Sequence, residues 1–342
     1  MVARCRGGWP WPAWAVACLG LAAAALLQPV HAAGETAPVA QAAPQGIQAW
    51  LERLHEASRN RAYTGTFVVS ADGEMAASRI WHICDGSQQL ERIDSLTGPQ
   101  RTTVRRNDEV LTLLPDAQLA WRETRDAFRL FPDFLRQPGQ QIASYYQARN
   151  GGTDRVAGHE ASLVEFLPRD DWRFAYRVWS EKRTGLVIKL QTLGATGEVL
   201  EQVAFTELQL DAPLRMAALE RLMSPPKDYR LKEPTVRKTT AEAEGWRLKA
   251  GVPGFQSVSC QVQLPAKAGM PAMMQWVFSD GMASVSLFVE TFDPQRHTKE
   301  KAVASGATHS LTRRLDSHWV TALGEVPPKT LQAFVSALER SR

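Results

Sequence analysis

Apolar and polar residues alternate with a period of two along most of this chain, and the clearest run lies at 276–290. Its first apolar residues, Trp276 to Phe278, lead into Ser279-Asp280-Gly281. Beyond this turn the residues on one side of the run are apolar, namely Ala283, Val285, Leu287 and Val289. Because Asp-Gly supplies the positive φ angles of a short turn, the run predicts a β-hairpin.

Similar alternating runs recur through the first two thirds of the chain and are separated by turn residues. They lie at 63–70, 79–84, 89–95, 102–106, 109–114, 161–167, 174–180, 186–193 and 198–210. Short strands at a spacing of roughly 8–12 residues indicate an antiparallel sheet or an open barrel.

Helical spacing appears at the two ends of this β pattern. Residues 46–60 place Ile47, Trp50, Leu51 and Leu54 on one face. A second helix begins near Pro328, with Leu331, Phe334, Val335 and Leu338 on one face. The apolar segment at 125–137 predicts a short helix or a loop.

The β rhythm stops at 211–244, where Ser224-Pro225-Pro226 and Glu233-Pro234 interrupt a charged run. We interpret this stretch as a linker between domains at 45–210 and 245–342. The predicted fold class is therefore α+β and β-rich. An N-terminal unclosed antiparallel half-barrel with helices precedes a smaller β-rich C-terminal domain that ends in a helix.

The first 32 residues have the features of a signal peptide. Arg4 and Arg6 precede an apolar stretch at 14–27, and Val30-His31-Ala32 offers small residues for cleavage. A membrane anchor is disfavoured because the apolar run is shorter than the roughly 20 residues that span a bilayer. A lipoprotein signal at Cys18 is the other alternative. We expect an exported protein with a disordered leader at 33–44.

Charge and cysteine content change this interpretation little. Of 40 basic residues, removal of Arg4 and Arg6 leaves 38 against 36 acidic ones, so bulk charge does not favour a nucleic-acid partner. After cleavage Cys84 and Cys260 remain. Two cysteines in an oxidising compartment can pair, but each also ends a strand-like run, where a small buried thiol is common, and the two are expected to lie in different domains. The sequence leaves both alternatives open and favours two thiols.

The sequence carries no motif for catalysis, metal binding or cofactor binding that we recognise. The histidines never reach metal-ligand spacing with cysteines or with one another. Asp170-Asp171 and Ser279-Asp280-Gly281 are better explained as turns than as catalytic groups. We therefore expect a binding protein with no cofactor, although an enzyme with a dispersed site is a further hypothesis.

The order of several short blocks resembles the RseB/MucB family of periplasmic negative regulators of the envelope-stress sigma factor. These blocks are YTGTFV at 63–68, VAGHEA at 156–161, PRDD at 168–171, YRVW at 176–179, RTGL at 183–186, GEVL at 197–200, FSDGMASVS at 278–286 and VTALGEVPP at 320–328. The resemblance covers nearly all of the chain after the leader.

The resemblance implies a LolA/LolB-like N-terminal domain, no enzymatic activity and a periplasmic location. It also implies binding to the periplasmic region of a membrane-spanning anti-sigma factor (RseA/MucA-like). Such binding shields the anti-sigma factor from proteolysis, and lipopolysaccharide or mislocalised lipoprotein reverses it. A periplasmic lipoprotein or lipid carrier is the alternative function. Self-association into a homo-oligomer is left open.

The family's lipid contacts are implied to lie in the first domain and its partner contacts in the second. The apolar face of the first sheet is either a packed core or an accessible surface for an acyl chain. For lipid binding we predict Phe67, Val69, Ile80, Leu111, Leu113, Phe128, Phe131, Phe134, Val164, Phe166, Tyr176, Val178 and Phe205. For partner binding we predict Phe278, Asp280, Met282, Ser284, Phe288, Arg313 and Arg314.

Overall fold

The computed structural model describes residues 47–124, 142–264 and 271–341. The expected signal peptide and leader lie outside these residues, as do Phe128, Phe131 and Phe134 of the predicted lipid-binding set. In the part of the chain that the structure describes, no helix is long and apolar enough to cross a membrane.

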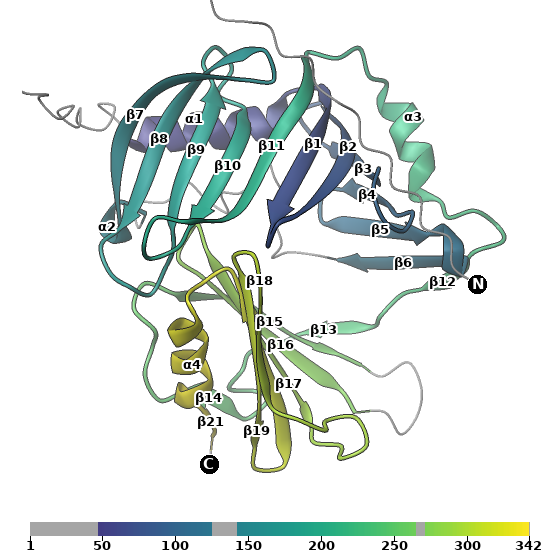
Figure 1. The fold of residues 1–342 in the computed structure, drawn as a ribbon. Coiled ribbons are helices and arrows are strands. Elements are labelled where there is room, and N and C mark those ends of the chain that lie inside the picture. Colours follow the sequence, from purple (N-terminus) through teal and green to yellow (C-terminus); the bar gives the residue numbers. More distant parts are fainter. Residues whose placement is uncertain (1–46, 125–141, 265–270, 342) are drawn as a thin grey trace, which may run out of the picture. The chain divides into compact units, whose positions relative to one another are not determined.

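A twelve-stranded sheet forms the first part of the fold, with strand order β12-β6-β5-β4-β3-β2-β1-β11-β10-β9-β8-β7 (Figure 1). Its edges, β12 and β7, do not pair with each other, so the sheet is open. All neighbours are antiparallel except β12 and β6. The strands are β1 (Tyr63–Ala71), β2 (Glu74–Cys84), β3 (Gln89–Ser95), β4 (Thr102–Arg106), β5 (Glu109–Leu114), β6 (Leu119–Thr124), β7 (Tyr146–Val156), β8 (His159–Pro168), β9 (Ala175–Glu181), β10 (Val187–Leu193), β11 (Val199–Leu210) and β12 (Arg230–Lys232).

Helix α1 (Ile47–Asn60) covers one face of this sheet, as its apolar spacing predicts. Its side chains Leu51 and Leu54 are buried in one cluster with Val164 and Phe166 of β8. In β1, Gly65 allows close contact with β11, because a Cβ there would lie 2.4 Å from the carbonyl oxygen of Glu207. Short helices α2 (Ile142–Tyr145) and η1 (Pro115–Ala117) connect strands.

A seven-stranded antiparallel sheet forms the second part, in the order β13-β15-β16-β17-β20-β19-β18. The strands are β13 (Val236–Lys238), β15 (Gln256–Gln263), β16 (Met273–Ser279), β17 (Ser284–Thr291), β18 (Lys301–Ser305), β19 (Thr308–Leu315) and β20 (His318–Gly324). A separate pair joins β14 (Trp246–Leu248) to β21 (Leu338–Arg340).

The hairpin predicted at 276–290 is confirmed as β16 and β17, which pair from Met273 with Glu290 to Ser279 with Ser284. Helix α4 (Pro328–Ala337) packs on one face of this sheet, where Phe334 contacts Phe278 at a ring separation of 4.8 Å. The predicted fold class, an open N-terminal sheet with a helix and a smaller β-rich second part with a C-terminal helix, is confirmed.

The predicted linker contains ordered elements that join both sheets. Helices α3 (Met216–Glu220) and η2 (Arg221–Met223) come first, then β12 pairs with β6 and β13 pairs with β15. The boundaries at 210 and 245 stay a prediction. Cys84 on β2 and Cys260 on β15 are free thiols on different sheets.

Candidate functional site

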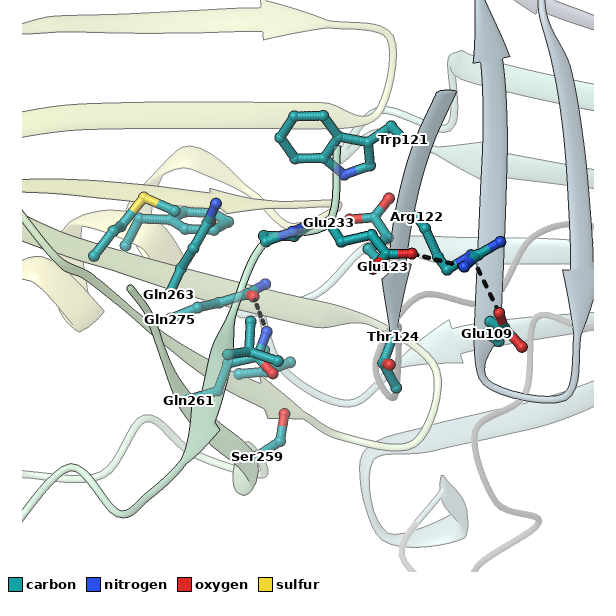
Figure 2. Close-up of a pocket in the computed structure, with 15 residues that line it drawn as sticks. Glu109, Trp121, Arg122, Glu123, Thr124, Glu233, Ser259, Gln261, Gln263 and Gln275 are labelled. Atoms are coloured by element: carbon teal, nitrogen blue, oxygen red, sulfur yellow. Dashed lines mark hydrogen bonds and ion pairs between the residues drawn. The ribbon is translucent and has the colours of Figure 1, made fainter. Parts of the chain in front are cut away.

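A cleft of about 780 Å³ lies between the edge of the first sheet and one face of the second. Figure 2 shows residues of β5 and β6 facing residues of β15 and β16 across it. This volume is in the usual range of ligand pockets, roughly 300–1,000 Å³. The cleft is therefore the first candidate for a binding site.

The floor of the cleft is the face of the second sheet that does not pack on α4. On β15 the core side chains Cys260 and Val262 alternate with residues that line the cleft. This alternation is the period of two expected of a strand with two different faces. The floor residues are Ser259, Gln261, Gln263, Met273, Gln275, Val277 and Phe288.

Arg122 organises the opposite wall. Its Nη1 donates to Oε1 of Glu233 at 2.6 Å, and its Nε lies 3.4 Å from Oε1 of Glu109. Nη2 of the same side chain donates to the carbonyl oxygen of Met223. These contacts tie the segment after β12 to β5 and β6 (Figure 2).

A second site, the Arg173–Asp280 junction, joins the two sheets through buried polar groups. Both side chains are fully buried, and Nη1 of Arg173 lies 3.1 Å from Oδ2 of Asp280. The Tyr146 hydroxyl donates to the same Oδ2 atom, also at 3.1 Å. Arg173 also donates to Oδ1 of Asp170 and to the carbonyl oxygen of Pro253. The guanidinium therefore uses most of its donors within the protein.

Burial governs the ionisation of these groups. It raises the pKa of the Asp280 carboxyl, whereas the Arg173 charge and the backbone N–H groups of Met282 and Ala283 oppose this rise. Burial together with the Asp280 charge raises the pKa of Tyr146 well above its usual value, so the phenol remains protonated and donates to Asp280.

Contacts beside the junction extend the connection between the sheets. Thr330 at the start of α4 donates its hydroxyl to the carbonyl oxygen of Trp172 at 2.7 Å. Lys329 pairs with Asp171 and lies 4.8 Å from the Trp172 ring centroid. Asp171, interpreted from sequence with Asp170 as a turn, thus contacts the second part of the fold, whereas Asp170 accepts from Arg173 next to it.

The residues predicted to bind a partner are separated by the fold. Phe288 lines the cleft, and Arg313 and Arg314 are exposed on β19. Phe278 and Asp280 are buried, the first in the core and the second in the junction. Met282 packs against the core under α1, and Ser284 is half-buried. Their role in partner binding stays a prediction.

The described residues predicted to bind lipid form packed clusters. Phe67, Val69, Ile80 and Phe205 lie in one cluster, and Val164, Phe166, Tyr176 and Val178 lie in a second one with α1. Leu111 and Leu113 belong to a third cluster with residues of α3 and η2. In this structure these residues are packed in cores, which is the first of the two alternatives given for the apolar face of the first sheet. Their contact with lipid stays a prediction.

Sequence reasoning missed Arg173, Arg122 and the three cleft glutamines. The Gln-x-Gln pattern at 261–263 was the only local signal, and it resembles any solvated strand face. Among residues 47–124, 142–264 and 271–341, no group of three or more histidine, cysteine or acidic side chains is arranged to hold a metal ion.

The protein has an open, largely antiparallel sheet and a second sheet. A buried ion pair joins the two sheets, and a polar cleft lies between them. These features place it among two-part, β-rich proteins. The chain belongs to the MucB/RseB family. The model of the MucB/RseB N-terminal domain matches residues 46–223, and that of the C-terminal domain matches residues 240–339.

Two relatives have names that describe regulation of a sigma factor. The chain is 30% identical over 297 residues to "Sigma factor AlgU regulatory protein MucB" of Pseudomonas aeruginosa, covering 83% of this chain and 87% of that protein. It is 25% identical over 295 residues to "Sigma-E factor regulatory protein RseB" of Escherichia coli K12, covering 85% and 90%.

Solved structures of MucB share the fold over most of the chain. MucB in complex with MucA(peri) matches with a TM-score of 0.65 at 25% identity, covering 86% of this chain and 98% of that one. The Pseudomonas aeruginosa MucA/MucB complex matches with a TM-score of 0.67 at 26% identity, covering 86% and 99%.

Proposed function

We propose that this chain is a periplasmic regulator without enzymatic activity that binds the periplasmic region of a membrane-spanning anti-sigma factor. The observation that carries the proposal is the match of both family domains, in order, to MucB, which has been solved in complex with MucA(peri). The protein shields its partner from the protease that starts the degradation of the anti-sigma factor.

Release of the partner follows from a ligand that prefers the free regulator. A ligand can shift an equilibrium only by its difference in affinity for the two states. Changing a regulator from mostly bound to mostly free requires about 5.5 kcal/mol, which burial of about seven methylene groups supplies. Acyl chains of lipopolysaccharide or of mislocalised lipoprotein are the ligands that fit this requirement.

The second sheet favours a regulator over a lipid carrier. It contributes the floor of the cleft and Asp280 of the Arg173–Asp280 junction. Both sites therefore require the second sheet. A carrier of acyl chains needs only the first sheet, whose apolar face and helix α1 enclose one core.

Protection of the partner is the property to test. We expect the mature chain to capture the purified periplasmic region of the anti-sigma factor from its own organism. We also expect it to slow cleavage of that region by the envelope protease, and lipopolysaccharide to restore cleavage. Rapid cleavage in the presence of excess regulator would rule out this function.

A further inference from the structure

The second sheet has two chemically different faces, and only one of them is occupied by the protein's own core. Trp276 of β16 and Leu287 of β17 belong to the cluster under α4. The opposite face has half-buried glutamines in place of a core and lines the cleft. A broad sheet face bordered by a cleft is suited to receive another molecule.

Cross-strand amides dominate the middle of this face. Gln261 and Gln275 are register partners on β15 and β16, and Nε2 of Gln261 donates to Oε1 of Gln275 at 2.9 Å. Gln263 lies two residues further along β15. Each primary amide offers both donors and acceptors, which are the groups that the peptide main chain also carries.

Apolar side chains flank the amides. Met273 is the register partner of Gln263, and Phe288 is the register partner of Gln275. Met adapts its shape to different neighbours, and a half-buried Phe offers a large contact area. A ligand with polar groups along its length and apolar groups at intervals matches this arrangement, and an extended polypeptide has that chemistry.

The lining of the cleft carries more acidic than basic side chains. Glu109 and Glu233 are both paired with Arg122, and Arg106 contacts Glu109 as well. Glu123 is a third carboxylate in the lining. This excess of negative charge disfavours an acidic ligand, so the cleft is suited to a segment without acidic residues.

The rim of the cleft adds apolar contact area. Val236 on the edge strand β13 is an exposed apolar residue, and it also lines the cleft. A segment lying on the sheet face beside Gln261 and Gln263 would therefore meet an apolar side chain at the rim as well as Met273 and Phe288.

We propose that this cleft binds an extended segment of the anti-sigma factor's periplasmic region that lacks acidic residues, with Gln261, Gln263 and Gln275 contacting its main chain and Met273 and Phe288 its side chains. This inference rests on the proposed function and adds the location and chemistry of the contact.

The test compares two cross-strand glutamine pairs. The variant Gln261→Ala with Gln275→Ala removes the pair in the cleft. The control Gln191→Ala with Gln202→Ala removes a pair of the same chemistry on β10 and β11, where Nε2 of Gln191 donates to Oε1 of Gln202 at 2.7 Å. Binding of the purified periplasmic region is measured by titration, and thermal unfolding shows that each variant folds.

We expect the cleft variant to bind about tenfold more weakly, because it loses several hydrogen bonds to the peptide. Phe288→Ala is expected to weaken binding by a similar or larger factor of about tenfold or more. The control pair should leave binding unchanged. If the unaltered chain binds and the cleft variants bind as tightly as the control, the cleft is not the contact with the anti-sigma region. Failure of the unaltered chain to bind overturns the proposed function itself.

A photo-crosslinking residue at Gln263 provides a second measurement. We expect it to capture the anti-sigma region, and mass spectrometry of the product identifies the captured segment. The same residue at Gln202 should capture none. Capture of lipopolysaccharide at Gln263, with no capture of the anti-sigma region, contradicts a peptide site.

Discussion

Arg173 and Asp280 are 107 residues apart in sequence and form an ion pair, with both side chains fully buried, between the two sheets. Arg173 lies just before β9, and Asp280 lies in the turn between β16 and β17. Buried ion pairs are costly to disrupt because the remaining charge is left without a partner in a desolvated site. The pair therefore makes the contact between the sheets depend on both residues together.

The first prediction is a double-mutant cycle on this pair. Arg173→Ala and Asp280→Ala should each lower the free energy of unfolding by about 3–5 kcal/mol, since each leaves a buried charge. The double variant should cost less than the sum of the two. Urea unfolding measures all three variants.

An exposed pair is the control for this cycle. Lys182 and Glu160 are 3.4 Å apart, with side chains 57% and 77% exposed. Their cycle should give a coupling of about 0–1 kcal/mol. Additive effects at Arg173 and Asp280, equal to those of the exposed pair, would contradict a coupled junction.

The second prediction concerns Gly254, which packs against the Arg173 guanidinium. Its φ is +85°, and a Cβ at this position would lie 2.6 Å from Nη2 of Arg173. Gly197 has the same φ, but a Cβ there meets nothing within 4 Å. Gly197→Ala therefore measures the backbone cost alone, about 1–2 kcal/mol.

Gly254→Ala should destabilise the protein by about 1–3 kcal/mol more than Gly197→Ala, because the added methyl group displaces a buried guanidinium. Chemical denaturation of the two variants side by side gives this difference. Equal stability of the two variants would show that the junction has room for the methyl group.

Local patterns predicted the elements well where each element has one apolar face. Helix α1 and the β16–β17 hairpin follow directly from spacing and from Asp-Gly turn chemistry. Strand β7 was missed because it is an edge strand of mostly polar residues, with a bulge at Asn150 and Gly152. No apolar alternation marks such a strand.

The junction and the cleft could not be predicted in the same way. Asp280 looks like a turn residue because it is one, and its Oδ1 accepts from the N–H groups of Met282 and Ala283. Its second role depends on Arg173, and no local spacing joins the two. Likewise, the face of β15 that carries Gln261 became a cleft floor only because β6 lies opposite it.

The third prediction concerns the reactivity of Cys260. Burial, reinforced by the Glu244 and Glu242 charges, raises the pKa of its thiol to about 11. At pH 8 the thiolate fraction is then on the order of one in a thousand. Iodoacetamide should therefore modify Cys260 very slowly in the native protein and rapidly in urea.

Mass spectrometry of the alkylated peptides follows this reaction, and half-buried Cys84 provides the reference rate. Fast alkylation of native Cys260 at pH 8 would contradict the raised pKa. A disulfide-linked peptide containing both cysteines would contradict the two free thiols.

The last prediction addresses the apolar face of the first sheet. Phe166 and Val178 have no exposed surface, and they share a cluster with Leu51 and Leu54 of α1. An acyl chain reaches these residues only when α1 moves away from the sheet. Lipid binding there exchanges helix–sheet contacts for lipid–sheet contacts, so the buried apolar area is largely kept.

We therefore expect lipopolysaccharide to accelerate amide hydrogen exchange in α1 while exchange in β16 and β17 stays unchanged. Hydrogen-exchange mass spectrometry with and without lipopolysaccharide measures both segments in one experiment. Bound lipid with unchanged exchange in α1 would place the acyl chain elsewhere and remove these residues from the lipid site.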